Sequence, residues 1–249
     1  PVFDVQSTAS AAMNLTLGAL TDQAIAPRTI TFQNSGTAAS SVTLSTAATS
    51  LLDGTVINLA STGGALTLNT NITNALGAFA QITVGAGNTL SLGASQTIGA
   101  LNGSGTVTAT ANSTLTIGNT LSTTVSNGTF NGVLSGSSLS IVKSGSGSLT
   151  LGGSDSNTFS GPAGTVINSG TLILAKTGGA VAISTNVTVG TANGTSGTAV
   201  LQLNGSEQIA SSATLTVNAG STVNLNGNSQ TLGNLKGPPG GAILNKATG

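Results

Sequence analysis

Short segments in which apolar and polar residues alternate recur along the whole chain of 249 residues. Successive side chains of a strand point to opposite faces, so such a segment buries Leu, Ile or Val and exposes Thr, Ser or Asn. No apolar series with helical spacing lasts three turns, so we expect an all-β chain. The clearest segments are residues 14–17, 29–32, 41–44, 65–68, 81–84, 89–92, 114–117, 148–151, 186–189, 200–203, 214–217 and 222–225.

The chain also contains a long-range internal repeat. Residues 89–105 match residues 222–238, with the shared pattern Gln-Thr-Ile/Leu-Gly-x-Leu at 96–101 and 230–235. Self-similarity of this kind indicates a solenoid of stacked turns. Glycines end many of the segments, and we expect them to adopt the positive φ of a sharp corner. Examples are Gly85, Gly93, Gly99, Gly118, Gly190 and Gly233.

A β-sandwich is the alternative fold, but it usually has seven to nine strands around buried aromatic residues. Here the segments are more numerous, and five Phe are the only aromatic residues. The narrow core of a parallel β-helix suits stacked aliphatic rows. We therefore predict a single β-helix domain over residues 1–249. With roughly 20–25 residues per rung and about 4.8 Å between strands, it would have roughly ten to twelve rungs and be about 50 Å long.

The composition excludes several classes of function. Charged residues make up 4% of the chain and sum to zero net charge, so no basic patch can neutralise nucleic acid or anionic lipid. There is no Cys or His, and five scattered acids cannot form a calcium array. Glycan-cleaving β-helical enzymes need clustered carboxylates. We therefore expect no enzyme activity, cofactor or metal. No apolar run is long enough for a membrane-spanning helix, so we expect no membrane insertion.

A denser motif occupies the middle of the chain: Lys, then Gly-x-Gly-x-Leu-x-Leu, Asn-x-Phe-x-Gly and Thr-x-Ile-x-x-Gly-x-Leu. The region from about residue 89 to 174 resembles the autotransporter-associated β-strand repeat, also called the passenger-associated transport repeat. Each piece is built from common residues, and the order and spacing carry the resemblance. The matching residues are Lys143, Gly145, Gly147, Leu149, Leu151, Asn157, Phe159, Gly161, Thr165, Ile167, Gly170 and Leu172.

The resemblance implies a right-handed parallel β-helix on a bacterial cell surface or in secreted material. It implies no catalytic activity, because the repeat is a structural unit. The C-terminal translocator barrel of that family has no counterpart in this sequence. The chain also begins at Pro1 without a signal-like stretch. We therefore expect a mature chain or an excised fragment.

The two ends of the coil suggest how copies join. A strand equivalent to residues 114–117 is missing after the second copy of the internal repeat, and residues 13–18 look like that strand. We hypothesise that residues 1–18 form an exchange or capping strand that completes an incomplete C-terminal rung, residues 232–249, of another subunit. The predicted contact residues are Met13, Leu15, Leu17, Leu235, Ile243 and Leu244.

The sequence therefore predicts a structural subunit of an extracellular or surface fibre that assembles head to tail as a homopolymer. Ends trimmed from a longer passenger are the alternative explanation of the missing strand. A monomeric adhesin is the alternative function, and surface glycans are then a candidate partner. Residues 154–164 and 190–198 are the best candidate adhesive loops, although both are short.

Overall fold

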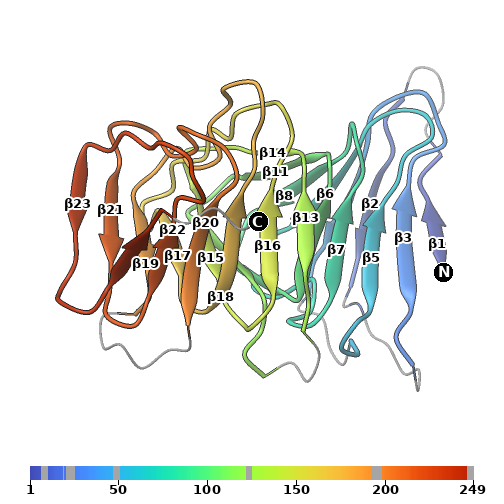
Figure 1. Cartoon of the computed structure of the whole chain (residues 1–249). Helices are drawn as coiled ribbons and strands as arrows, with labels where there is room; N and C mark the ends of the chain where they lie inside the picture. The colour runs from blue at the N-terminus through green and yellow to red at the C-terminus, as the bar shows by residue number, and fades with distance from the viewer. Residues whose placement is uncertain are drawn as a thin grey trace.

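The computed structural model describes residues 1–6, 11–18, 20, 26–46, 51–121, 125–191 and 198–245. In these residues the chain winds as a coil whose successive turns stack along one axis (Figure 1). The strands belong to three sheets, each running along the coil, and every pairing between strands is parallel. The described residues contain no helix. The predicted all-β solenoid is confirmed.

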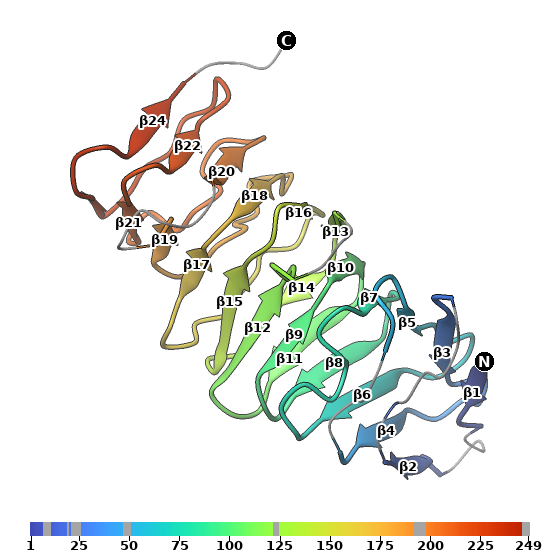
Figure 2. The ribbon, with the colours of Figure 1, turned by 90° about the horizontal axis from the view of Figure 1, so that it is seen from below.

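One sheet, here called the long sheet, extends from the first turn to the last and has eleven strands. The coil has about nine turns, so the prediction of ten to twelve rungs is close. The two edge strands of this sheet, β1 and β24, lie at opposite ends of the coil (Figure 2). Its strands in order are β1 (Val2–Asp4), β3 (Thr29–Gln33), β5 (Val56–Leu59), β7 (Gln81–Val84), β10 (Ala100–Gly103), β13 (Gly128–Phe130), β16 (Ser148–Leu151), β18 (Gly170–Leu174), β20 (Ala199–Leu203), β22 (Thr222–Asn224) and β24 (Ala242–Leu244).

The other two sheets share the length of the coil between them. The N-terminal sheet contains β2 (Asn14–Leu17), β4 (Ser40–Leu44), β6 (Leu66–Thr70), β8 (Thr89–Leu92), β11 (Thr106–Ala109) and β14 (Val133–Leu134). The C-terminal sheet contains β9 (Gln96–Ile98), β12 (Ser113–Ile117), β15 (Leu139–Lys143), β17 (Thr165–Ile167), β19 (Val187–Val189), β21 (Thr214–Val217) and β23 (Asn234–Lys236). Each of the twelve predicted segments overlaps one of these strands.

The core is a set of apolar columns that run parallel to the axis. In β4, Val42 and Leu44 are fully buried while Thr43 between them faces outward, as the alternation predicts. Cα pairing in the long sheet links one column without a break from Phe3 to Leu203. Its members are Phe3, Phe32, Leu59, Val84, Gly103, Phe130, Leu151, Leu174 and Leu203.

The prediction of positive φ at the segment-ending glycines holds at Gly118 and Gly190 and is wrong at the other four. Close approach between turns explains those four. A Cβ added to Gly99 would lie 2.5 Å from the backbone oxygen of Phe79, and one added to Gly233 would lie 2.5 Å from that of Ser212. At Gly85 and Gly93 the nearest atom of the neighbouring turn would be 2.6 Å away. At these corners a side chain has no room beside the next turn.

The internal repeat is real in the sequence but its two copies fall on different faces of the coil. Residues 89–92 form β8 of the N-terminal sheet, whereas residues 222–224 form β22 of the long sheet. The second copy is therefore shifted by one face. In the second copy the counterpart of residues 114–117 falls after β24, where residues 246–249 lie outside the described residues.

Buried side-chain amides take over hydrogen bonding where the chain turns away from a strand. Asn157 follows β14 on the face of the N-terminal sheet. Its Oδ1 accepts a hydrogen bond from the Leu134 N–H (2.9 Å), and its Nδ2 donates to the Ala182 carbonyl (2.8 Å). On the next turns, Gln208 bonds both backbone groups of Lys176, and Gln230 bonds both backbone groups of Ile209. The stack therefore continues beyond β14 without regular strands.

Replacing Asn157 should destabilise the coil at this corner. Asn157→Ala leaves the buried Leu134 N–H and Ala182 carbonyl without their partner, and we expect a loss of about 2–4 kcal/mol of unfolding free energy. Asn102→Ala is the matched control, because the half-buried Asn102 side chain accepts one solvent-exposed hydrogen bond, from Thr129 N. Its expected cost is below about 1 kcal/mol. Urea unfolding followed by circular dichroism measures both, and equal losses would contradict this role for Asn157.

Candidate assembly surfaces

The six predicted contact residues lie at the two ends of the coil, as head-to-tail contact requires. Met13, Leu15 and Leu17 belong to the first turn, and Leu15 and Leu17 pack half-buried against the core beside Val42 and Leu44. Leu235, Ile243 and Leu244 belong to the last turns and are about half exposed, as is Met13. The structure does not bring the two groups together within one chain.

The sequence similarity between residues 13–18 and residues 114–117 does not mean that they share a sheet. β2 pairs with β4 in the N-terminal sheet, while β12 pairs with β9 and β15 in the C-terminal sheet. Because the second copy of the repeat is shifted by one face, its counterpart of residues 114–117 would fall on the face of the N-terminal sheet. β2 lies on that face. The proposed exchange segment, residues 1–18, includes residues 7–10, and the proposed incomplete rung includes residues 246–249. Both stretches lie outside the described residues.

The N-terminal edge of the long sheet is β1, which the sequence analysis did not mark as a strand. Phe3 pairs with Phe32 and stacks on it with ring centroids 5.5 Å apart, yet 39% of Phe3 is exposed. Asp4 fastens the strand to the next turn, where it accepts hydrogen bonds from Ser35 and Gln33. Bonds from these two residues hold the pKa of the Asp4 carboxyl below its usual value. The strand is three residues long, too short for its alternation to stand out.

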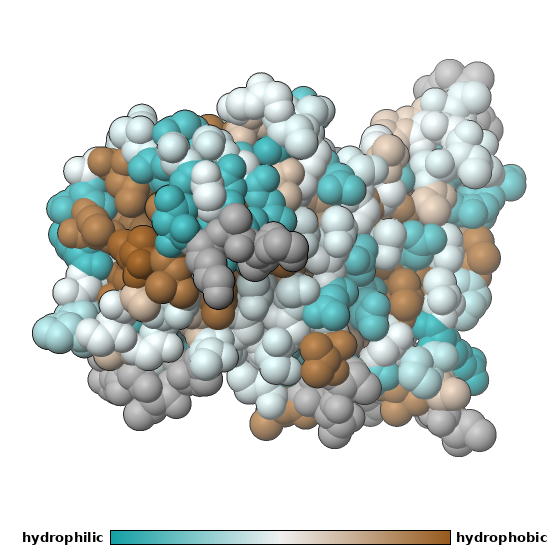
Figure 3. Space-filling model, in the orientation of Figure 1, coloured by the Kyte–Doolittle hydropathy of each residue, from teal (hydrophilic) through white to brown (hydrophobic). Residues whose placement is uncertain are grey.

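At the C-terminal end of the coil the apolar core is not covered by a further turn of the described residues. An apolar cavity of about 190 Å³ lies there between the last turns. A second, more open hollow of about 330 Å³ adjoins it, with Leu235 and Ile243 in both linings. Brown surface gathers at this end of the molecule, on the left of Figure 3. The apolar cavity is lined by Leu203, Ile209, Leu215, Val223, Leu225, Gln230, Leu232, Leu235 and Ile243.

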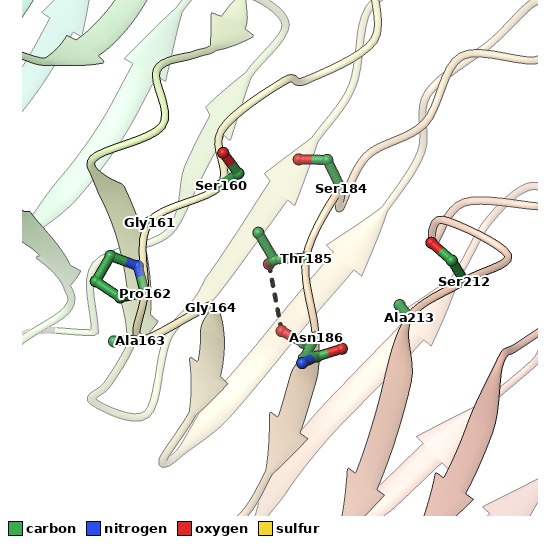
Figure 4. A pocket seen from close by; sticks show the side chains of 10 residues that line it. All are labelled: Ser160, Gly161, Pro162, Ala163, Gly164, Ser184, Thr185, Asn186, Ser212 and Ala213. Carbon is green, nitrogen blue, oxygen red and sulfur yellow. Dashed lines mark hydrogen bonds between the residues drawn. The ribbon is translucent and has the colours of Figure 1, made fainter.

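An open polar groove of about 450 Å³ lies on the side of the coil (Figure 4). Its walls carry hydroxyls of Ser160, Ser184 and Ser212 and no charged residue. It borders the first candidate adhesive loop, residues 154–164, in which Asn157 and Phe159 are buried. That segment is therefore packed into the stack over part of its length. The second candidate, residues 190–198, includes residues 192–197, which lie outside the described residues.

In the described residues no three Asp or Glu side chains come together as a possible metal site. In the same residues no helix is long and apolar enough to cross a membrane.

Two lysines are buried at corners of the coil. Lys143 is 1% exposed, and its Nζ donates to the carbonyls of Ser144 (2.6 Å), Gly145 (3.1 Å) and Ser169 (3.4 Å). Burial lowers the pKa of the Lys143 amine to about 8 from its ordinary 10.5. The ammonium group thus binds carbonyl oxygens of two successive turns at the C-terminal end of β15. Lys143 is the first residue of the sequence motif, but the motif alone does not explain why a lysine is there.

Lys176 has the same role at a different corner, after β18. Its Nζ donates to the carbonyl of Gly132 at 2.7 Å, across 44 residues of sequence. Burial lowers the pKa of the Lys176 amine, and the charge of Asp155 opposes that shift. A long side chain here reaches a backbone oxygen two turns away in the stack.

The shifted pKa of Lys143 makes stability depend on pH in a defined window. Between pH 8 and 10.5 the folded chain has released a proton that the unfolded chain still binds, so folding stability should rise with pH. Because the chain has no Cys or Tyr, few other groups titrate there. Thermal unfolding from pH 7.5 to 10 should show this rise in the unmodified chain. The rise should be smaller in Lys143→Met and unchanged in Lys236→Met, which alters an exposed lysine. A rise of the same size in Lys143→Met would contradict the assignment.

Comparison with known proteins agrees with this geometry. The family model described as Passenger-associated-transport-repeat matches residues 141–174, which run from β15 through β18. Neither a search of curated proteins nor a search of solved structures found a match. The matched residues include Lys143 and Asn157, whose side chains hold adjacent turns together. Residues 141–174 are therefore similar to a passenger-associated transport repeat and lie within a β-solenoid. This similarity is consistent with an autotransporter passenger repeat and suggests a secreted or surface-exposed protein.

Proposed function

We propose that this protein is a structural subunit of an extracellular fibre and that its copies assemble head to tail through the ends of the solenoid. The observation that carries the proposal is the long sheet, whose edge strands β1 and β24 lie at opposite ends of the coil. Both edges carry exposed apolar side chains, among them Val2 and Phe3 at one end and Ile243 and Leu244 at the other. Unpaired strand edges of this kind accept strands from other chains.

The charge and symmetry of the chain agree with such a polymer. Its formal net charge is zero, so stacked copies do not repel one another as charged subunits would. All strands are parallel, so a copy shifted along the axis presents β1 to β24 in the same direction. Contacts between different ends of identical subunits do not close on themselves unless rotation forms a ring, and they produce open filaments. The protein acts in this proposal as a building element, without catalysis or a cofactor.

Electron microscopy at micromolar concentration tests the proposal directly. The unmodified chain should form uniform thin fibres. Ile243→Lys should abolish them, because it places a charge at the end of the core where the next copy would sit. Thr129→Lys should leave them intact, since Thr129 is exposed on the side of β13, far from either end.

Circular dichroism is the folding control: both variants should keep the β-sheet signal of the unmodified chain. Discrete rods of the unmodified chain at every concentration would refute the fibre proposal. That result would favour the monomeric adhesin, in which the side groove around Ser160 and Ser184 becomes the first surface to test for glycan binding.

A further inference from the structure

We infer that the long sheet continues from one copy into the next, with β1 paired in parallel to β24 and Phe3 opposite Ile243. The inference rests on the proposed head-to-tail function and adds the register of the junction. It also assigns the apolar cavity at the C-terminal end to one occupant, the Phe3 ring of a second copy. Three features of the two edges support it: the direction of their free backbone groups, the side chains that face the core, and the length of the strands.

The backbone groups of β1 divide into two sets. The Pro1 carbonyl accepts a hydrogen bond from Thr31 N, and Val5 N donates to the Gln33 carbonyl, both at 2.9 Å. The intervening residues Val2 and Asp4 must direct their backbone groups the opposite way, because these alternate along a strand. The outer edge of β1 therefore offers the N–H and C=O groups of Val2 and Asp4.

The backbone groups of β24 divide in the complementary way. Ala242 N donates to the Ser221 carbonyl at 3.0 Å, and the Leu244 carbonyl accepts from Leu225 N at 2.7 Å. Ile243 between them directs its N–H and C=O outward. In a parallel ladder one residue bonds to two alternate residues of its neighbour. Ile243 can therefore donate to the Val2 carbonyl and accept from Asp4 N, which satisfies both outward groups of Ile243 and two of the four on the outer edge of β1.

The side chains fit this register. Phe3 pairs with the buried Phe32, and Ile243 pairs with the buried Val223, so both point toward the core column. Ile243 is 45% exposed at the rim of the 190 Å³ cavity. Placed opposite Ile243, the ring of Phe3 would lie between Phe32 of its own chain and the open core of the second copy. The apolar surfaces exposed at the two ends would then cover each other and be removed from water together.

One other register preserves the backbone pattern. Extending the Cα pairing of the long sheet by one residue sets Leu225 beside Leu203 and Asn245 beside Leu225. Asn245 therefore lies in the column that begins at Phe3. Strict continuation of that column would set Phe3 opposite Asn245. We favour Ile243, because that register pairs all three residues of β1 with all three of β24 and sets an apolar side chain against the aromatic ring.

Cysteine pairs can distinguish these registers, since the chain has no native cysteine. In the proposed register Val2 lies opposite Ala242, with Cα atoms about 4.8 Å apart, within the range a disulfide spans. The variant Val2→Cys/Ala242→Cys, exposed to air oxidation, should therefore give a ladder of covalent oligomers in a non-reducing gel, and reductant should collapse the ladder to monomer. Val2→Cys/Leu244→Cys tests the register with Phe3 opposite Asn245, and each single variant controls for random dimers.

Each outcome has a definite meaning. A ladder from the Val2/Ala242 pair alone supports the inference. A ladder from the Val2/Leu244 pair alone overturns the register while the fibre proposal stands. Fibres in the microscope without a ladder from either pair would show that the junction does not continue the long sheet. Absence of both fibres and ladders refutes the proposed function together with the inference.

A second measurement tests the assigned occupant of the cavity. Phe3→Ser should raise the protein concentration needed for assembly by about tenfold or more, because the end cavity loses its apolar occupant. Thr129→Ser on the exposed face of β13, far from either end, is the control and should leave that concentration unchanged. An unchanged assembly threshold in Phe3→Ser would show that the ring does not fill the cavity.

Discussion

Every turn of this coil depends on hydrogen bonds to the turns on either side of it. Parallel strands supply those bonds along the faces, but the chain must also change direction several times in each turn. At a corner the backbone groups no longer point regularly at their neighbours, and a buried backbone group without a partner is costly. The corners, more than the faces, therefore limit which sequences can form the coil.

Several of the least expected buried residues are explained by this limit. Asn157, Gln208 and Lys143 place polar atoms against backbone groups of an adjacent turn, where a strand would otherwise supply the partner. Gly161 leaves no room for a side chain beside the backbone of Leu139. Three of these four residues lie in the stretch that matches the passenger-associated transport repeat. In this chain, those three residues shape the corners of the coil.

The same distinction separates what the sequence predicts from what it does not. Alternation revealed strands such as β6 and β16, since one buried face leaves a period of two. It could not assign a strand to a face: residues 89–92 and 222–225 match in sequence, yet they belong to different sheets. A face is determined by the number of residues in the preceding corner, and corners carry no periodic signal. Short strands such as β1 and β14 were missed for a related reason, since two or three residues cannot display a period.

The residues of the proposed contact carry a signal in the sequence at one end of the coil and none at the other. Leu235, Ile243 and Leu244 stand out because apolar residues follow an interrupted repeat, and the structure places them on the last turns. Val2 and Phe3 carry no comparable signal. They enter the proposed contact because of the topology of the long sheet, which makes β1 one of its two edges.

The requirement for pairing is also the reason to propose the two ends of the coil as assembly surfaces. Inside the coil each turn satisfies its neighbours, and the side walls present mainly neutral Thr, Ser and Asn with their backbone groups already bonded. Among the described residues, β1 on the first turn and β24 on the last are the edge strands of the long sheet, and both carry exposed apolar side chains. A surface that is neutral and internally satisfied gives a partner little to bind, whereas an open edge can be completed by another parallel strand. The interaction that stabilises one turn on the next is thus the same interaction that would join one copy to the next.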